Sequence, residues 1–447
     1  MYFEPLRGCC GADPQSVQDF SATCYGLSAD LAMPLFLFLV SLLPFVRHPI
    51  WSRDVNQISV VKYVGLACFL YAVIHVASRR RLPTYLSTPQ ARLFLVFLGA
   101  VCLSYATSPG TFTLEVNPFI SYASFAVMFI ITLSVVDSVR RLRWVLLTTV
   151  GSLGFGSLYV LREWQKYRHY GFLRAPAWDF GDSNGFAVSV LISLPLGCCL
   201  LLERRPLWER LFCFLSLVVM VVALLLGASR GGFLGLVAAC LVLIWRSRRR
   251  GRYAAVTIVL AGAIGLAPIS PLQRLLHPRQ GDTQAVENRE NAWRAGFRMV
   301  EAHPLTGIGL GAFKAMMLAY ADTEARRAFV AHNTYLEVAA EMGLPSLLVF
   351  LALLFFSYRS LRRTWEYASR HGPPLVRHAA LGLEAGLAGS CVAVFFISGE
   401  SVKLFWFAIF LSMCLPTLVN VRRPQERPAV VHPNEPVLSA EQPIGGR

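Results

Sequence analysis

Long apolar stretches, each about as long as a membrane is thick, recur along almost the whole chain. A helix needs roughly 20 such residues to cross a ~30 Å hydrocarbon core, and a spanning segment must satisfy its backbone hydrogen bonds internally. The sequence therefore predicts an all-α, polytopic transmembrane helix bundle of about 12 spans. The predicted spans lie at 29–46, 58–77, 91–107, 117–136, 144–160, 184–202, 209–227, 232–246, 253–270, 335–357, 379–398 and 402–419.

The charge distribution gives the predicted bundle an orientation. Only 15% of the residues are charged, against about 25% in soluble domains, and the net charge is +16. If the N-terminus is cytoplasmic, 25 of the 42 Lys and Arg fall on the cytoplasmic side, against 4 in the short connections of the other side. This asymmetry follows the positive-inside rule and places both termini in the cytoplasm. The positive charge then faces anionic lipid, and no nucleic-acid partner is expected.

The chain divides into five predicted regions. Residues 1–28 lack the basic start and short apolar core of a signal peptide, so a cytoplasmic N-terminal segment is expected there. Spans 1–9 occupy 29–270 and spans 10–12 occupy 335–420, while the polar, proline-containing residues 421–447 predict a disordered cytoplasmic tail. Between the two sets of spans, 271–334 is too long for a plain connection and predicts a long outer loop with amphipathic helices.

The outer loop holds one clear helical pattern and one glycine-rich segment. Arg289, Trp293, Gly296, Phe297 and Val300 fall on one helical face, which would lie along the membrane surface or cover a cavity. The three glycines of the segment 307–311 follow a proline and no strand precedes them, so they are no dinucleotide fingerprint. We expect a flexible loop there.

Two of the candidate chemical groups border apolar spans. Arg230 lies between small residues in the segment Gly227-Ala-Ser-Arg-Gly-Gly232, where a ligand can approach the backbone and a guanidinium can bind phosphate with two hydrogen bonds. His332 precedes the tenth span; at a helix N-terminus its ring would stay neutral and accept a proton near pH 7. The alternatives are an arginine that marks the end of a span and an interfacial histidine without a task.

Three further groups are weaker candidates. Arg289 and Trp293, one turn apart, suit an anionic headgroup or a sugar face, and equally an ordinary surface helix. Asp182 and Asn184 precede the sixth span and are also common N-cap residues. Glu341 lies inside the tenth span, where a carboxylate should pair with an arginine or stay protonated. The cysteines show no metal-ligand spacing and no nucleotide loop is visible, so no metal and no cofactor is predicted.

Taken jointly, these motifs resemble the O-antigen ligase and O-antigen polymerase superfamily. The resemblance depends on the order and spacing of the motifs between residues 180 and 360, and on their predicted location on the same side of the membrane. Ser183 replaces a proline of the family pattern, and Ser346 also departs from it. The matching segments are Ser229-Arg-Gly-Gly232, Arg289 with Trp293, His303-Pro-Leu-Thr-Gly-Ile-Gly-Leu-Gly311, His332-Asn333 with Gly343, and Asp182-Ser-Asn-Gly-Phe-Ala187.

The resemblance implies a metal-independent glycosyltransferase of the bacterial inner membrane. Its donor would be an undecaprenyl-diphosphate-linked glycan, and its acceptor lipid A core, a growing glycan or a protein hydroxyl. Arg230 and Arg289 would hold the diphosphate and stabilise its charge as it leaves, while His332 would orient or deprotonate the acceptor hydroxyl. The further predicted substrate-binding residues are Ser229, Gly231, Trp293, Asn333, Asp182, Asn184 and Glu341.

Two other classes of function stay open at this point. A polysaccharide polymerase would share all the motifs above. A membrane transporter or flippase would instead place ionisable groups near the bilayer midplane, where Lys62, Glu384 and His75 are the candidates.

Overall fold

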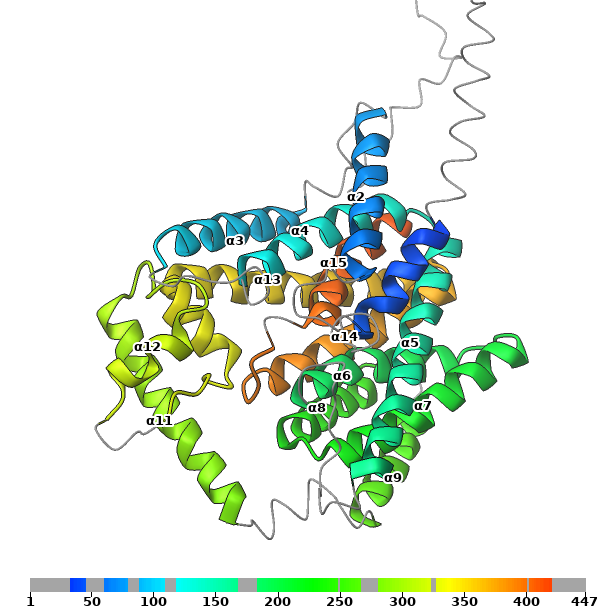
Figure 1. Cartoon of the computed structure of the whole chain (residues 1–447). Coiled ribbons are helices and arrows are strands. Elements are labelled where there is room, and N and C mark those ends of the chain that lie inside the picture. The colour runs from blue at the N-terminus through cyan, green and yellow to red at the C-terminus, as the bar shows by residue number, and fades with distance from the viewer. Residues whose placement is uncertain are drawn as a thin grey trace, which may run out of the picture.

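The computed structural model describes the chain as a bundle of helices (Figure 1). It describes residues 33–45, 60–78, 88–108, 118–167, 183–247, 250–266, 280–322, 327–399 and 402–419, and no strand occurs among them. The predicted N-terminal segment 1–28 and tail 421–447 lie outside these residues. The helices are Met33–Phe45 (ending in η1, Leu43–Phe45), α2 (Val60–Ser78), α3 (Pro89–Ala106), α4 (Pro118–Val135), α5 (Val139–Tyr167), α6 (Ser183–Leu201), α7 (Leu207–Gly227), α8 (Arg230–Arg246), α9 (Arg250–Leu266), α11 (Gln280–Ala302), α12 (Phe313–Tyr320), α13 (Thr334–His371), α14 (Pro374–Ala393) and α15 (Lys403–Leu418).

The all-α prediction is confirmed for the described residues, and each predicted apolar stretch contains a helix. By length and composition, six of the described helices could cross a membrane, namely α3, α4, α5, α6, α7 and α13. The full set of about twelve spans, and the side of the membrane on which 271–334 lies, stay predictions.

The centre of the bundle is α6, which packs against α14, α7 and α8. Glycines bring the backbones close there. A Cβ at Gly382 of α14 would lie 2.6 Å from Cα of Leu196, and one at Gly389 would lie 2.6 Å from the carbonyl oxygen of Gly235 in α8. Small residues are common where two membrane helices cross. Lipid provides no hydrophobic driving force for helix association, so association depends on close packing.

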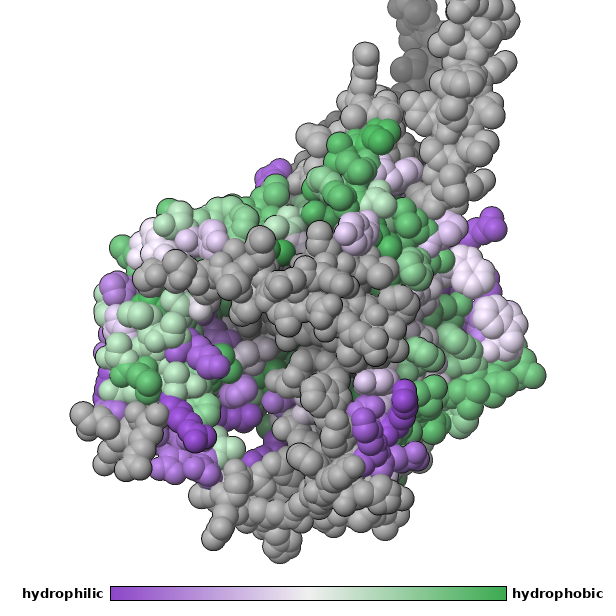
Figure 2. All heavy atoms as spheres, in the orientation of Figure 1, coloured by the Kyte–Doolittle hydropathy of each residue, from purple (hydrophilic) through white to green (hydrophobic). Residues whose placement is uncertain are grey.

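The surface of the bundle changes character from one side to the other (Figure 2). Hydrophobic residues cover α7, where Leu211, Phe214 and Leu215 are each more than half exposed. Hydrophilic residues gather over α11, whose outer face carries the ion pairs Arg294–Glu290 and Arg298–Asp322. Exposed apolar helix faces are expected against lipid tails, and charged ones against water.

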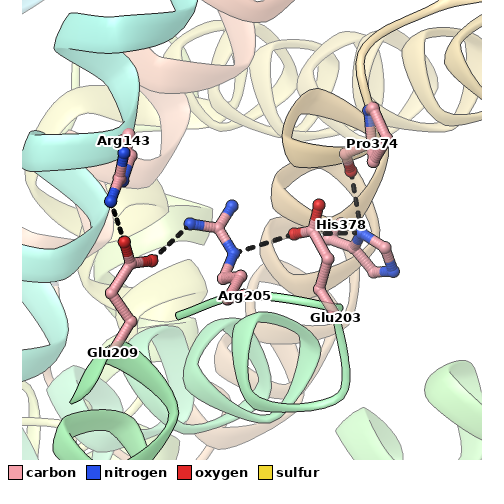
Figure 3. A network of polar contacts seen from close by, with 6 residues as sticks. All are labelled: Arg143, Glu203, Arg205, Glu209, Pro374 and His378. Atoms are coloured by element: carbon pink, nitrogen blue, oxygen red, sulfur yellow. Dashed lines mark hydrogen bonds and ion pairs between the residues drawn. The ribbon is translucent and has the colours of Figure 1, made fainter. Parts of the chain in front are cut away.

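A chain of buried charges joins the beginnings of α5, α7 and α14 (Figure 3). Glu209, fully buried, accepts hydrogen bonds from Arg143 and from Arg205, the latter at 2.7 Å. Arg205 also donates to Glu203 at 3.0 Å, and Nδ1 of His378 lies 3.3 Å from the same carboxylate. The exposed indoles of Trp144 and Trp208 stack beside this network, as aromatic residues do at membrane–water interfaces.

Candidate functional site

The turn after α14 is the place where the predicted site segments meet. Residues 394–399 join α14 toward α15, and four successive members contact the three parts of the site on α11, α8 and α13. Phe395 packs edge to face on Trp293 of α11, with 5.7 Å between the ring centroids. Phe396 and Ile397 lie against Gly231, next to Arg230. Ile397 and Ser398 hydrogen-bond to residues of α13. We call residues 394–399 the hub turn.

The beginning of α13 is fixed to the hub turn by backbone and side-chain hydrogen bonds. The amide of Thr334 donates to the carbonyl of Val394 at 3.0 Å. The Thr334 hydroxyl donates to the carbonyl of Ile397 and accepts from the amide of Gly399, both at 2.8 Å. Tyr335 donates to the carbonyl of Cys391 at 2.8 Å. The N-terminus of α13 therefore has one defined position against the end of α14.

His332 lies directly before this fixed helix start. Asn333 is the N-cap of α13: its side-chain oxygen accepts from the amides of Tyr335 and Leu336 at 3.1 and 3.2 Å, as an N-cap does. His332 itself is half-buried and has a φ of +51°, a left-handed conformation that non-glycine residues rarely adopt without compensation from their surroundings. The expected helix-terminal position of His332 is therefore observed, and Asn333 serves as a cap.

The residue before His332 is held at both of its backbone polar groups. The indole of Trp293 donates to the carbonyl oxygen of Ala331 at 2.8 Å, and the Glu337 carboxylate accepts from the amide of Ala331 at 3.0 Å. Trp293 thus contacts the chain next to His332 as well as the hub turn. Arg289 lies one turn earlier on α11 and is half-buried. The helix that carries Arg289 is therefore joined through Trp293 to residues 331–333, which we call the histidine segment.

The sequence predicted a break between two apolar stretches around Arg230, and α7 does end at Gly227, while Arg230 itself is the first residue of α8. Ser229 is the N-cap, and its hydroxyl accepts from the amide of Gly232 at 3.2 Å. The same hydroxyl donates to the side-chain oxygen of Asn184, at the beginning of α6, at 2.9 Å. A Cβ at Gly231 would lie 3.1 Å from Cβ of Phe396, so α8 begins against the hub turn. Asp182 lies outside the described residues.

The prediction of a flexible loop at 307–311 is wrong, because the segment 304–311 packs into a break in α13. Gly343 has a φ of +81°, and Pro345, two residues later, has no amide hydrogen to continue the ladder. The carbonyls left by the break accept from the loop: Ile308 donates to Ala340 at 2.8 Å and Gly309 to Glu341 at 3.1 Å. The glycines allow the backbone of this segment to approach the backbone of α13 closely, and the hydrogen bonds fix the segment in place.

Glu341 meets two backbone amides, which are partners that the sequence did not predict. Its carboxylate accepts from the amides of Gly311 and Phe313 at 2.8 and 3.0 Å, at the beginning of α12. A carboxylate is stabilised at a helix N-terminus by unpaired amides and by the helix dipole. Glu341 therefore joins α12 to α13, and its predicted contact with substrate stays a prediction.

One residue of the predicted inner face of α11 lies outside the buried face. Trp293 and Gly296 pack inward as expected, together with Ala292, Ala295 and Met299. Phe297, which the helical pattern assigns to the same face, is 57% exposed. An apolar side chain of that size on the outer face of an otherwise charged helix suits a surface close to lipid.

Sequence reasoning missed the residues that join the site segments. The hub turn is apolar apart from Ser398 and offers no chemical motif, and Glu337 is in sequence only a second acidic residue of α13.

Of the midplane residues that a transporter would use, Glu384 is fully buried and lies 3.3 Å from Nε of Arg246. The side chains of Lys62 and His75 lie outside the described set. Within the described part of the chain, no group of three His, Cys, Asp or Glu gathers as metal ligands would.

Comparison with known protein families finds a match in the region of the candidate site. Residues 215–351 match the family model described as O-antigen ligase. The matched range runs from the middle of α7 into α13 and includes Arg230, Arg289 and His332. No curated protein matches the chain. The family match confirms the resemblance to the O-antigen ligase superfamily that the motifs predicted, and with the candidate spans it supports an integral membrane protein.

Proposed function

We propose that this chain transfers a glycan from undecaprenyl diphosphate to a hydroxyl acceptor at the periplasmic face of the bacterial inner membrane. The family match points to an O-antigen ligase- or polymerase-like membrane glycan transferase. The main structural support for the proposal comes from the contacts of the hub turn. This turn contacts the segments that hold Arg230, Arg289 and His332, which lie about 100 residues apart from first to last in the sequence.

The two ends of α14 supply a physical argument for placing the site at one membrane face. His378, near the beginning of α14, belongs to the buried charge network, and the hub turn follows the end of this 20-residue helix. At 1.5 Å per residue, the stretch of α14 from His378 to Ala393 is roughly 23 Å long, which is most of the ~30 Å thickness of a hydrocarbon core. The network end carries the predicted cytoplasmic connections, so the site end would face the periplasm.

The proposed reaction needs a positioned base and positive charge. The acceptor oxygen attacks the anomeric carbon and forms the new glycosidic bond, while the bond from that carbon to the diphosphate oxygen breaks. The hydroxyl proton passes to the His332 imidazole, and the electron pair leaves with the lipid diphosphate. Arg230 and Arg289 would bind the oxygens on which negative charge grows. Charge placed in advance where it develops is a large source of rate enhancement, and a diphosphate is already a good leaving group.

The test is a transfer assay with purified protein, a synthetic lipid-linked glycan and a hydroxyl acceptor. Arg230→Lys keeps the charge and loses the two-pronged guanidinium, so we expect kcat/KM to fall by about 100- to 1,000-fold, in the range of one lost transition-state hydrogen-bond donor. Arg363→Lys, at an exposed position near the other end of α13, is the matched control and should leave transfer unchanged. Full activity of the Arg230→Lys variant would contradict a diphosphate clamp.

A deletion in the native host separates the two related activities. Accumulation of full-length lipid-linked polymer would indicate a ligase, while loss of polymer length would indicate a polymerase. Movement of labelled glycan lipid across reconstituted liposomes without any product would instead favour a transporter and contradict transfer.

A further inference from the structure

One buried carboxylate touches both sides of the proposed site. Oε1 of Glu337 accepts a hydrogen bond from the amide of Ala331 at 3.0 Å and another from the hydroxyl of Ser398 at 2.8 Å. Ala331 immediately precedes His332, and Ser398 belongs to the hub turn against which α8 begins. Glu337 is only 6% exposed, so these two donors meet it away from bulk water.

We propose that Glu337 is a positioning residue for the transfer reaction, which holds His332 in place relative to the end of α8 that carries Arg230. This inference rests on the proposed function for its chemical meaning. The carboxylate acts through the backbone of Ala331 on one side and through Ser398 on the other, and it has no assigned contact with substrate. A single oxygen atom therefore connects the histidine segment to the hub turn.

The backbone at His332 gives the carboxylate a specific task. A φ of +51° is a left-handed conformation that costs an L-residue roughly 1–2 kcal/mol. Such a conformation persists only where the surroundings determine it. The peptide before His332 is held by Glu337 and Trp293, and the residue after it caps α13. Hydrogen bonds to a charged acceptor are the stronger kind, so loss of the carboxylate should free the histidine segment first.

In this proposal Glu337 acts through its acceptor oxygen, and this separates positioning from catalysis. Gln at 337 keeps an acceptor oxygen of the same reach and can still accept from Ala331 and Ser398. A glutamate that took a proton or stabilised a cation in the reaction would be disabled by the same change. Glu337→Gln should therefore keep most of the transfer activity, and Glu337→Ala should not.

The experiment measures the reactivity of His332 directly, independently of transfer. Purified protein in detergent is treated with diethylpyrocarbonate, and labelling of each histidine is followed by peptide mass spectrometry. In Glu337→Ala the rate at His332 should rise about tenfold, the size expected when a hydrogen bond to a charged group is lost. The rates at His303 and His371, both exposed, should stay unchanged and serve as internal references.

Matched variants separate positioning from general loosening of the fold. Ser398→Ala should raise His332 labelling in the same direction, while Ser412→Ala, a buried serine that bonds within α15, should not. Glu209→Ala removes another buried carboxylate at the opposite end of the bundle. It should lower thermal stability without a selective rise at His332.

Transfer assays on the same variants complete the test. We expect kcat to fall by about 10- to 100-fold in Glu337→Ala, as for small misplacements of catalytic groups, with near-normal kcat in Glu337→Gln. Unchanged His332 labelling in Glu337→Ala would overturn the inference, as would a Gln variant as inactive as the Ala variant. If labelling changes as expected but His332→Ala still transfers glycan, the positioning contact stands and the proposed function fails.

Discussion

Replacement of Gly307 by alanine tests the rigid joint between the 304–311 segment and the break in α13. Gly307 has a φ of +71°, so an alanine there starts with a backbone cost of about 1–2 kcal/mol. Its Cβ would lie 2.3 Å from the carbonyl carbon and oxygen of Glu341. That distance is impossible for real atoms, so one of the two backbones must move.

The required movement sets the size of the effect. The two adjacent hydrogen bonds, from Ile308 to Ala340 and from Gly309 to Glu341, span the same joint at 2.8 and 3.1 Å. Each contributes about 0.5–1.5 kcal/mol, and separating the backbones weakens both. Added to the conformational cost, the expected destabilisation is about 2–5 kcal/mol.

The assay is thermal unfolding of the detergent-purified protein, followed with a thiol-reactive dye that reports exposure of buried cysteines such as Cys198 and Cys414. A destabilisation of this size should lower Tm on the order of 5 °C. The control is Gly99→Ala in α3, where an added Cβ meets nothing within 4 Å. Alanine there should stabilise the helix by about 0.5–1 kcal/mol. A Gly307→Ala variant that melts with the Gly99→Ala control would refute the proposed joint.

Three further predictions concern charge and metal. Burial opposes ionisation of Glu203, but the hydrogen bond from His378 and the charge of Arg205 outweigh it and lower the Glu203 pKa. The stabilisation from this carboxylate is therefore present above the unfolded pKa of about 4.3 and is lost as pH falls through the lower folded pKa. Glu203→Gln should flatten a curve of Tm against pH in that acid range. The hydrogen bond from Arg298 lowers the pKa of Asp322, so Asp322→Asn should speed proteolysis of the α11–α12 segment while leaving Tm nearly unchanged; equal cleavage of both proteins would contradict the contact. Addition of EDTA should leave the transfer rate unchanged, and loss of activity restored by a divalent cation would refute metal-independent transfer.

The helices could be predicted because apolar length carries most of the information in a membrane protein. The predicted spans 184–202 and 209–227 differ by at most two residues from α6 and α7. The predicted span 335–357 was less accurate, since α13 extends to His371 and breaks near Gly343. The charged residues beyond 357 end the apolar pattern, whereas the helix continues because hydrogen bonding and packing do not depend on hydropathy.

The break in α13 does have a signal in the sequence. Gly343-Leu-Pro345 combines a residue that tolerates positive φ with one that lacks an amide hydrogen, and both punctuate helices. The wrong prediction of a flexible loop at 307–311 has a different physical origin. Several glycines in a loop are compatible with mobility and equally with close backbone contact, and only the partner segment decides between them. That partner, Ala340 to Gly343, lies about 35 residues away in the sequence.

The charged candidates could be recognised in the sequence because charged residues are rare beside apolar spans. The residues that position them are apolar and do not differ from the rest of a span. An arginine or histidine beside an apolar span is costly to keep, so Arg230 and His332 attract attention by their type alone. The residues of the hub turn, Phe395 to Ile397, look like the end of a span, and they position the site through shape and main-chain atoms. If that division is general for this fold, substitutions in the hub turn should impair transfer without changing any group that meets substrate, and labelling of His332 would report the damage before any loss of helical structure.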